Sequence, residues 1–400
     1  MNHRESLIVR IAIIAAVVLT TMSGCVAQPQ VTAGAIEKCS WPYGCDVKPE
    51  RAQDFPKIEG RATLPADTFI LGPPSGSKLG DEINGRRLPF ESQPVQGFSA
   101  VLDADEADDT YWVVTDNGFG TDENSPDFLL RMYRISANFE VGRGGAGEIS
   151  VKDYIQLRDP DRHIPFRIKN ENTEERLLTG ADFDPESVRR DRAGDLWFGE
   201  EYGPFLLHTD ATGRVLEAPF PQPNVRTPEN PYIWSPRRAN LPSSKGFEGM
   251  ALSADGRFLY PALGGALRYD PDQRRRLIYE FDLQKHLYTG KHWHYRTDDP
   301  ENTLSDLSLL TGDPQHRMLV VERTTAKSEG AQHVRVYLVD LGKVDRSGYL
   351  IKHKVLELPE YQVESIIALD DQDVLMITDN DYPFTTNDTQ AIIARIGDPP

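Results

Sequence analysis

The chain has 400 residues, a formal net charge of −18 and 3 Cys residues. This acidic balance argues against nucleic-acid binding, which needs a basic face, and against a polybasic membrane patch. An acidic protein binds an anionic substrate only through bridging cations or a local group of Lys and Arg side chains.

The first residues have the pattern of an export signal. A basic stretch from Arg4 to Arg10 precedes an apolar run, Ile11 to Leu19, which is shorter than the roughly 20 residues that a membrane-spanning helix needs. This order of regions is typical of a signal peptide, here over residues 1–24. The run Met22-Ser23-Gly24-Cys25 resembles a bacterial lipobox, although Met22 replaces the usual Leu. The resemblance implies that Cys25 is acylated and anchors an exported cell-envelope lipoprotein to a membrane. The alternative is an ordinary secretory signal with a chance Cys.

Residues 25–58 are polar, contain Pro and Gly and show no periodicity, which is typical of a tether. Cys39 and Cys45 flank a short turn-prone loop within it. In an oxidising compartment two thiols this close are expected to form a disulfide, and no nearby His or second Cys pair suggests a metal site. Residues 59–400 then form the main domain, which is expected to be a monomer.

The main domain contains an internal repeat. Each of five units has a polar residue before a short apolar strand, a turn bearing Gly or Asp, and a second apolar strand that ends in charged or amide residues. The units recur about every 60 residues, with a longer first interval. The residues that we align at the start of the first strands are Ser99, Glu186, Glu248, Asp306 and Glu364.

These repeats predict an all-β fold, since no convincing amphipathic helix is found. A repeat of this length suits one four-stranded blade, and polar residues at a constant strand end suggest radial symmetry. We therefore expect a β-propeller with about five to six four-stranded blades. A strand near Ala62 to Ile70 would complete the last blade and remove an exposed sheet edge. A sixth blade could occupy the long first interval.

Five motifs carry a family resemblance over about residues 60–398. They begin at Asp182 (DFDPES), Gly199 (GEEYGP), Gly246 (GFEGM), Val321 (VER) and Asp379 (DNDY). In this order they resemble the phytase-like family, also described as having the esterase-like activity of phytase. The chain departs from the expected pattern with Ser at 187 and 365, where Gly is expected, and with Asp306, where a Glu is expected.

The strand-end residues suggest a cation site. Carboxylates that share one channel raise each other's pKa, and a hard divalent cation such as Ca²⁺ accepts carboxylate and amide oxygens as ligands. The candidate metal ligands are Asp116, Asn117, Glu186, Glu248, Glu364, Asp379 and Asn380. Glu186, Glu248, Glu322 and Glu364 are expected to meet at the channel. The structural alternative is that such residues bond to backbone N–H groups of the next blade.

Three functions remain open at this point. The first is a metal-dependent hydrolase of ester or phosphoester small molecules, with Glu201, Glu322 and Arg323 as candidate catalytic residues. The second is a calcium-propeller lactonase similar to gluconolactonases. The third is a surface lipoprotein that binds a ligand or partner without catalysis. No Gly-x-Ser-x-Gly elbow, zinc helix or phosphate-binding Gly loop occurs in the sequence.

Overall fold

The computed structural model describes residues 57–103, 110–142, 144–310, 317–324, 333–359 and 361–397. These residues belong to one compact unit, Gln53–Pro400. The predicted signal peptide, the lipidated Cys25, most of the tether and the Cys39–Cys45 disulfide lie outside the described residues. No helix in the described part of the chain is long and apolar enough to cross a membrane.

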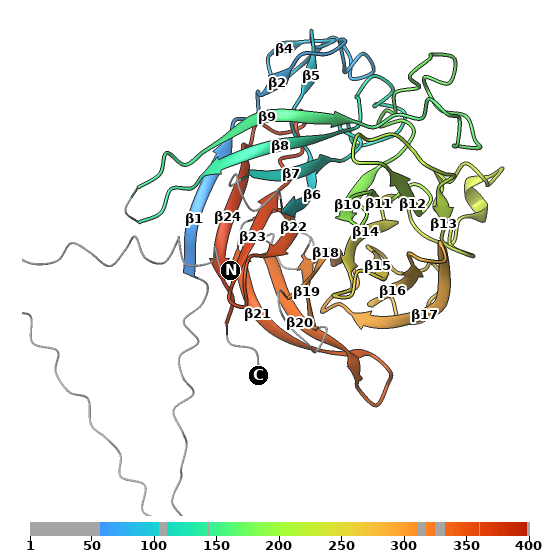
Figure 1. The fold of residues 1–400 in the computed structure, drawn as a ribbon, viewed down its shortest axis with the longest axis vertical. Coiled ribbons are helices and arrows are strands. Elements are labelled where there is room, and N and C mark those ends of the chain that lie inside the picture. The colour runs from blue at the N-terminus through green and yellow to red at the C-terminus, as the bar shows by residue number, and fades with distance from the viewer. Residues whose placement is uncertain are drawn as a thin grey trace, which may run out of the picture. The chain divides into compact units, whose positions relative to one another are not determined.

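The described unit is a β-propeller of five four-stranded blades, seen in Figure 1. Blade 1 contains β6 (Phe98–Asp103), β7 (Thr110–Thr115), β8 (Arg131–Asn138) and β9 (Glu148–Gln156). Blade 2 contains β10 (Pro185–Arg190), β11 (Leu196–Glu200), β12 (Phe205–Thr209) and β13 (Phe220–Pro221). Blade 3 contains β14 (Phe247–Leu252), β15 (Phe258–Leu263), β16 (Arg275–Asp282) and β17 (Leu287–Arg296).

The last two blades complete the ring. Blade 4 contains β18 (Thr303–Leu309), β19 (Arg317–Arg323), β20 (His333–Val344) and β21 (Leu350–Pro359). Blade 5 contains β22 (Val363–Ala368), β23 (Asp373–Thr378), β24 (Thr389–Arg395) and β1 (Lys57–Leu64). The innermost strands β6, β10, β14, β18 and β22 each contact the next around the ring, and β22 contacts β6.

Ring closure uses the N-terminal strand, as the sequence predicts, although this strand ends at Leu64 and not at Ile70. β1 pairs antiparallel with β24, so that it forms the outer strand of blade 5. It also meets β9 of blade 1 in parallel at Thr63 and Glu148, which joins blades 1 and 5 into one sheet of eight strands. The outer edge of β24 and the end of β9 are therefore both paired with β1.

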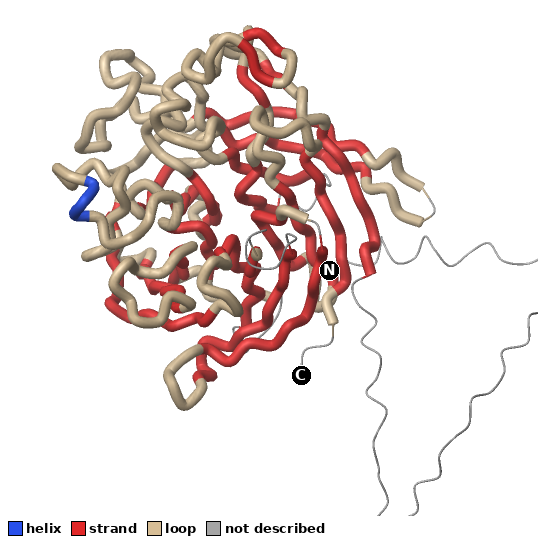
Figure 2. The backbone as a smooth tube through the Cα atoms, turned by 180° about the vertical axis from the view of Figure 1, so that it is seen from behind, coloured by secondary structure: helices blue, strands red, loops and turns tan. Residues whose placement is uncertain are grey.

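The long first interval holds no sixth blade. Residues 157–184 form turns and isolated bridges, and this loop is anchored by the buried Asp159. The Asp159 carboxylate accepts from the backbone N–H of His163 at 2.8 Å and pairs with Arg176 at 2.9 Å. Two small ribbons, β2 (Phe69–Ile70) with β5 (Gln93–Pro94) and β3 (Glu82–Ile83) with β4 (Arg86–Arg87), precede blade 1. One 3₁₀ turn, η1 (Pro236–Arg238), lies among the loops in Figure 2.

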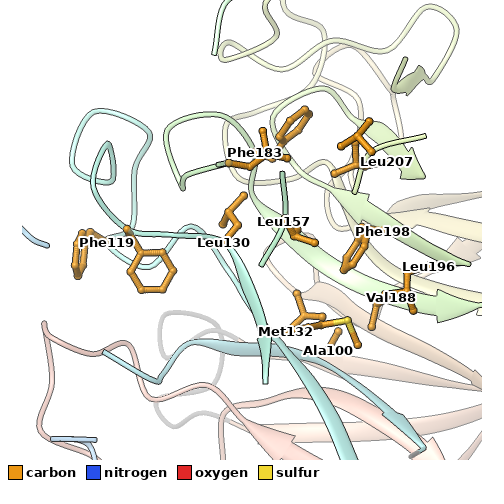
Figure 3. Packing of buried hydrophobic residues seen from close by; sticks show 14 of the residues in the cluster. Ala100, Phe119, Leu130, Met132, Leu157, Phe183, Val188, Leu196, Phe198 and Leu207 are labelled. Carbon is orange, nitrogen blue, oxygen red and sulfur yellow. The ribbon is translucent and has the colours of Figure 1, made fainter. Parts of the chain in front are cut away.

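Alternation along the strands builds the core. Successive side chains of a strand point to opposite faces, so that each blade packs on both neighbours. In β11, Leu196 and Phe198 pack toward blade 1, whereas Trp197 packs toward blade 3. Figure 3 shows Phe198 with Val188 of blade 2 near Ala100 and Met132 of blade 1. Because both faces of the inner strands are covered, these strands are largely apolar runs, whereas the outer strands β9, β17 and β21 are partly exposed.

Candidate functional site

A β-bulge opens every innermost strand. The register between first and second strand shifts near the start of β6, β10, β14, β18 and β22. A bulge inserts an unpaired residue and re-aims its side chain. The residues at the bulges are Ser99, Glu186, Glu248 with Gly249, Ser305 and Glu364. Ser99, Glu186, Glu248 and Glu364 line one pocket of about 190 Å³, so the bulges supply much of its wall.

The fourth blade corrects the sequence alignment by one residue. Ser305 occupies the bulge, and Asp306 is paired with Val321 and points to the opposite side. The fully buried Asp306 accepts hydrogen bonds from Ser365 Oγ at 2.9 Å and Ile366 N at 3.0 Å, both in blade 5. Its Oδ1 also lies 3.2 Å from an Arg189 nitrogen of blade 2. Asp306 therefore ties innermost strands together, which is the structural role considered for such residues.

The second strands contribute to the same pocket from their ends. Asp116 follows β7, Glu201 follows β11, Arg323 ends β19 and Asp379 follows β23. The pocket gathers eight carboxyl groups and two cationic side chains. The carboxyl groups belong to Asp116, Asp184, Glu186, Glu201, Glu248, Glu364, Asp379 and Asp381, and the cations to Lys245 and Arg323. Gly120, Ser244 and Asn117 complete the lining with Ser99.

Three of these carboxyl groups form a tight group, which we call the acidic triad. One oxygen each of Asp184, Glu186 and Glu201 lies within 4.8 Å of the other two. Asp184 and Glu201 are buried, and Glu186 is half-buried. Within the described part of the chain no hydrogen bond reaches Glu201 Oε1, which is buried. A buried carboxylate oxygen normally has a partner, so this oxygen is free to bind a ligand.

Neighbouring residues hold the acidic triad in place. Asn117 donates its backbone N–H to Asp184 Oδ1 at 2.9 Å and its side-chain amide to Oδ2 at 2.7 Å. The turn that carries Glu201 is closed by the buried Glu200. Its carboxylate accepts backbone N–H groups of Tyr202 at 2.9 Å, Gly203 at 2.7 Å and Phe205 at 2.8 Å. Asn117 and Glu200 therefore act as positioning residues.

The crowding of carboxyl groups raises their pKa values. Burial, followed by the charges of Asp184 and Glu201, raises the pKa of Glu186 well above its usual range. Burial and the neighbouring Glu248 and Asp184 do the same to the pKa of Glu201. Burial raises the pKa of Asp184 to about 6, against the hydrogen bonds from Asn117. Burial and mutual repulsion therefore favour proton or cation binding by these groups more in the folded protein than in the unfolded chain.

The remaining charged residues of the pocket come from blades 1, 3, 4 and 5 and include both of its cationic side chains. Arg323 lies 2.6 Å from Glu364 Oε1, and Lys245 lies 3.6 Å from Glu248 Oε1. Burial raises the pKa of Glu364 to about 8, although the charge of Arg323 opposes this. Burial and the charge of Asp381 raise the pKa of Asp379 to about 6. Burial, Asp379 and Asp184 raise the pKa of Asp116 in the same way.

Two sequence-predicted site residues do not line this pocket. Glu322 was expected at the channel, but it is fully buried, and Tyr295 of blade 3 contacts its carboxylate. Its carboxylate accepts from Asp298 N, Asn302 Nδ2, Tyr295 Oη and Lys352 Nζ at 2.6–2.9 Å. Successive strand residues face opposite ways, so Arg323 reaches the pocket and Glu322 cannot.

Asn380 is the second correction. Its amide donates to Asn387 O at 3.0 Å and its carbonyl accepts from Tyr382 N at 3.3 Å, which fixes the loop after β23. Sequence reasoning missed Asp184 and Lys245 as pocket residues. Asp184 could have been found, because it stands two residues before Glu186 and a strand places such residues on one face.

The donor set fits a hard divalent cation. The acidic triad offers only oxygens, Asp184 is oriented by a neighbouring amide, and Glu201 Oε1 has no competing bond within the described residues. Ca²⁺ accepts six to eight such oxygens, water included. No His or Cys is among the residues that line the pocket, and these are the ligands that zinc prefers.

Comparisons with known proteins show what the chain is similar to. One curated relative, a protein named "Uncharacterized secreted protein" from Arthroderma benhamiae, is 30% identical over 111 residues, which are 23% of this chain. The chain spans about a fifth of that relative's length, 22%.

The chain is also similar to solved structures. An endo-arabinase from Bacteroides thetaiotaomicron has 9% identity and a TM-score of 0.42, over 83% of this chain and 99% of the other. An exo-β-1,3-galactanase from Clostridium thermocellum has 11% identity and a TM-score of 0.43, over 81% and 61%. A virginiamycin B lyase from Staphylococcus aureus has 9% identity and a TM-score of 0.30, over 76% and 96%.

The family model described as "Phytase-like: Esterase-like activity of phytase" matches residues 93–382, which include the innermost strands of all five blades and every residue of the pocket. The chain therefore belongs to the phytase-like family.

Proposed function

We propose that the chain is a hydrolase of small esters or phosphoesters that uses a divalent cation, with Ca²⁺ as the first candidate, at the channel pocket. One observation carries this proposal. Asp184, Glu186 and Glu201 bring carboxylate oxygens within 4.8 Å of one another, and Glu201 Oε1 has no hydrogen bond within the described part of the chain. Like charges this close are stable only with protons or a cation between them.

The acidic triad would hold the cation. When bound, such an ion polarises the ester or phosphoryl oxygen and lowers the pKa of a coordinated water. Glu248 contacts both Glu201 and Lys245, and we assign it as the carboxylate that accepts a proton from water. Asn117 keeps Asp184 oriented toward the pocket through two hydrogen bonds.

The two cationic side chains favour an anionic substrate. Arg323 and Lys245 both line the pocket, on a chain whose net charge is −18. Each is paired with a Glu, so a phosphate or carboxylate could share its N–H donors without leaving a bare cation. We propose that Arg323 binds the acidic part of the substrate and that Lys245 supports it.

The segment from Pro219 to Pro242 is attached to a turn next to the pocket. Asn230 donates to Gly203 O at 2.5 Å, and Thr227 donates to Tyr202 O, so the segment is attached to the turn that carries Glu201. Trp234 is 80% exposed and stacks under the Arg238 guanidinium at 4.6 Å. We propose that this exposed pair contacts the part of the substrate that extends out of the pocket.

We also propose that the protein is an exported lipoprotein anchored through Cys25. The lipobox-like residues before Cys25 support the anchor, and the name of the Arthroderma benhamiae relative is consistent with export. Labelled fatty acid should be incorporated into the wild-type chain and not into Cys25→Ala. Incorporation into the variant would contradict the proposal.

An activity assay tests the proposed function. The purified chain is stripped with a chelator and assayed on a panel of aryl phosphates, aryl carboxylic esters and lactones, with and without added Ca²⁺. We expect Ca²⁺ to restore hydrolysis of one ester class and Glu201→Gln to abolish it. Hydrolysis of lactones alone would favour the lactonase alternative. No metal-dependent hydrolysis of any member would leave a binding protein as the better interpretation.

A further inference from the structure

A second group of potential ligands lies outside the channel, at the boundary of blades 2 and 3. His208 on β12, Glu217 after that strand and His286 in the turn between β16 and β17 bring one ligand atom each within 4.8 Å of one another. Glu217 Oε1 is 2.7 Å from His208 Nδ1 and 2.8 Å from His286 Nδ1. The His208 side chain is only 8% exposed, whereas Glu217 and His286 are half-buried, so solvent reaches one side.

Each ring nitrogen of His208 faces a carboxylate oxygen. A carboxylate only accepts, so a proton or another cation must lie between Glu217 and each Nδ1. If neutral His208 carries its proton on Nδ1, its buried Nε2 is a bare acceptor, and within the described residues no hydrogen bond reaches it. Nε2 instead faces another acceptor, Asp195 Oδ2, at 3.7 Å. The other neutral tautomer, with its proton on Nε2, removes this conflict and leaves the Nδ1 lone pair facing Glu217. An imidazolium with protons on both nitrogens would meet both carboxylates without a metal, and the experiment below separates the two cases.

The neutral tautomer with its proton on Nε2 fits a metal-binding histidine. Such a ring donates its other N–H to a carboxylate, which fixes the tautomer. Asp195 is the partner on that side of His208. The adjacent Asp191 is already used, because its carboxylate accepts from Trp197 Nε1 at 3.0 Å and from Ala193 N at 2.8 Å. The Nδ1 side of His208 is therefore the side open to a ligand.

We propose that His208, His286 and Glu217 bind one divalent transition metal ion of the zinc class, which links blade 2 to blade 3. Two imidazoles and one carboxylate form a donor set that Zn²⁺ accepts, with a fourth position open to water. The set differs from the oxygen-only channel pocket, so the two sites select different metals. This inference does not depend on the proposed function.

Trp197 provides a direct probe of the site. Its ring stacks on His208 with centroids 3.9 Å apart and planes 13° apart, and it lies 5.4 Å from the His286 ring. A paramagnetic ion such as Co²⁺ bound to these imidazoles would quench its fluorescence. The part of the emission that is lost in Trp197→Phe identifies the signal of this residue.

The experiment titrates Co²⁺ into the chelator-treated full chain and then displaces it with Zn²⁺. We expect saturable quenching of Trp197 that Zn²⁺ reverses. His286→Ala removes a half-buried ligand and should weaken binding at least tenfold. Asp195→Asn, which changes only the outer partner, should weaken it about 10–100-fold. The matched control is His292→Ala, an exposed His of the neighbouring strand β17, which should leave binding unchanged.

Two results would overturn the proposal. One is quenching that does not saturate, or that is equally strong in His286→Ala. The other is Trp197 emission that responds to pH in the presence of chelator but not to Co²⁺, because a proton and not a metal would then bridge Glu217 and the imidazoles. The channel variant Glu186→Gln shows whether the two sites are independent. It should retain the quenching of Trp197 by Co²⁺.

Discussion

The second strands of blades 2 and 4 end in the same way but present opposite charges to the channel. Glu200 pairs with the residue before the bulge in β10, and Glu322 occupies the corresponding place beside β18. Both carboxylates are fully buried. Glu200 accepts hydrogen bonds from its own turn, whereas Glu322 accepts them from blade 3, from the loop before β18 and from β21. The next residue faces the channel in each case, and it is Glu201 in blade 2 but Arg323 in blade 4.

The comparison separates structural carboxylates from functional ones. The Glu322 carboxylate has four partners, including the cationic Lys352, whereas Glu201 Oε1 has no hydrogen bond within the described part of the chain. The acidic side of the pocket, next to blades 1 and 2, is therefore suited to a cation, and the Arg323 side to an anionic substrate. Position in the strand, more than residue type, decides which role a carboxylate has.

The largest effect is expected from Glu322→Gln. The Gln amide would place a donor against two of the four donors that Glu322 accepts, and Lys352 would keep only Asp298 at 2.7 Å. The free energy of unfolding should therefore fall by on the order of 3–5 kcal/mol. Chemical denaturation with Ca²⁺ and with chelator measures it, and the loss should be the same in both. A loss that appears only with Ca²⁺ would instead place Glu322 in the cation site.

Glu201→Gln should have the reverse pattern. Without a cation the variant should be as stable as the wild type or more stable, because one of several close carboxyl groups is removed. A saturating cation at about 100 times its dissociation constant should stabilise the wild type by about 2.7 kcal/mol and the variant much less. Thermal melts measure both. Equal destabilisation with and without the cation would make Glu201 a structural residue.

The channel variant Glu248→Gln extends this test to the carboxylate that contacts Glu201 of the acidic triad. It keeps the side-chain shape and removes one charge, so Ca²⁺ stabilisation should weaken while the stability of the cation-free protein stays the same or rises. The same melts provide the readout. A variant that responds to Ca²⁺ like the wild type would remove Glu248 from the cation site.

Asn117→Ala should have a smaller effect on the same site. Asn117 does not need to bind the cation, because it orients Asp184 through its side-chain amide at 2.7 Å. Loss of such an outer partner typically weakens metal affinity about 10–100-fold. The shift should appear as a higher Ca²⁺ concentration at half-stabilisation. If Asn117→Ala weakens Ca²⁺ affinity as much as Glu201→Gln does, Asn117 is itself a ligand.

The smallest effect is a graded dependence on pH. The pKa of Asp184 is raised to about 6 and that of Glu364 to about 8, so the cation-free native state holds more protons than the unfolded chain. Its stability should therefore fall as the pH rises from about 4 to about 8. A saturating cation replaces the protons and should remove this fall. A cation-free protein that becomes more stable over this range would contradict the raised pKa values.

Much of the fold could be predicted from the sequence. Apolar strand pairs, turn residues and a regular interval predicted blades, and the short C-terminal unit predicted closure by an N-terminal strand. The blade number was uncertain, because residues 157–184 form a loop that lengthens the first interval beyond one repeat. That loop is held by a buried ion pair between Asp159 and Arg176, and such a long-range contact has no periodic signal.

The site was predicted less completely, for a geometric reason. Glu186, Glu201, Glu248 and Glu364 were placed at the channel because they recur at strand ends. A bulge shifts the side-chain alternation by one residue, and sequence alone does not locate it, so Asp306 replaced Ser305 in the alignment. The sequence also does not show which of two successive strand residues faces the channel, so Glu322 was placed there together with Arg323.

Calorimetric titration of Ca²⁺ into the chelator-treated protein tests the central claim most directly. Two buffers with different ionisation enthalpies reveal how many protons are released on binding. We predict saturable binding near neutral pH with release of protons from the acidic triad, and loss of both signals in Glu201→Gln. Absence of a saturable heat, or binding that is unchanged in Glu201→Gln, would contradict a cation site formed by Asp184, Glu186 and Glu201.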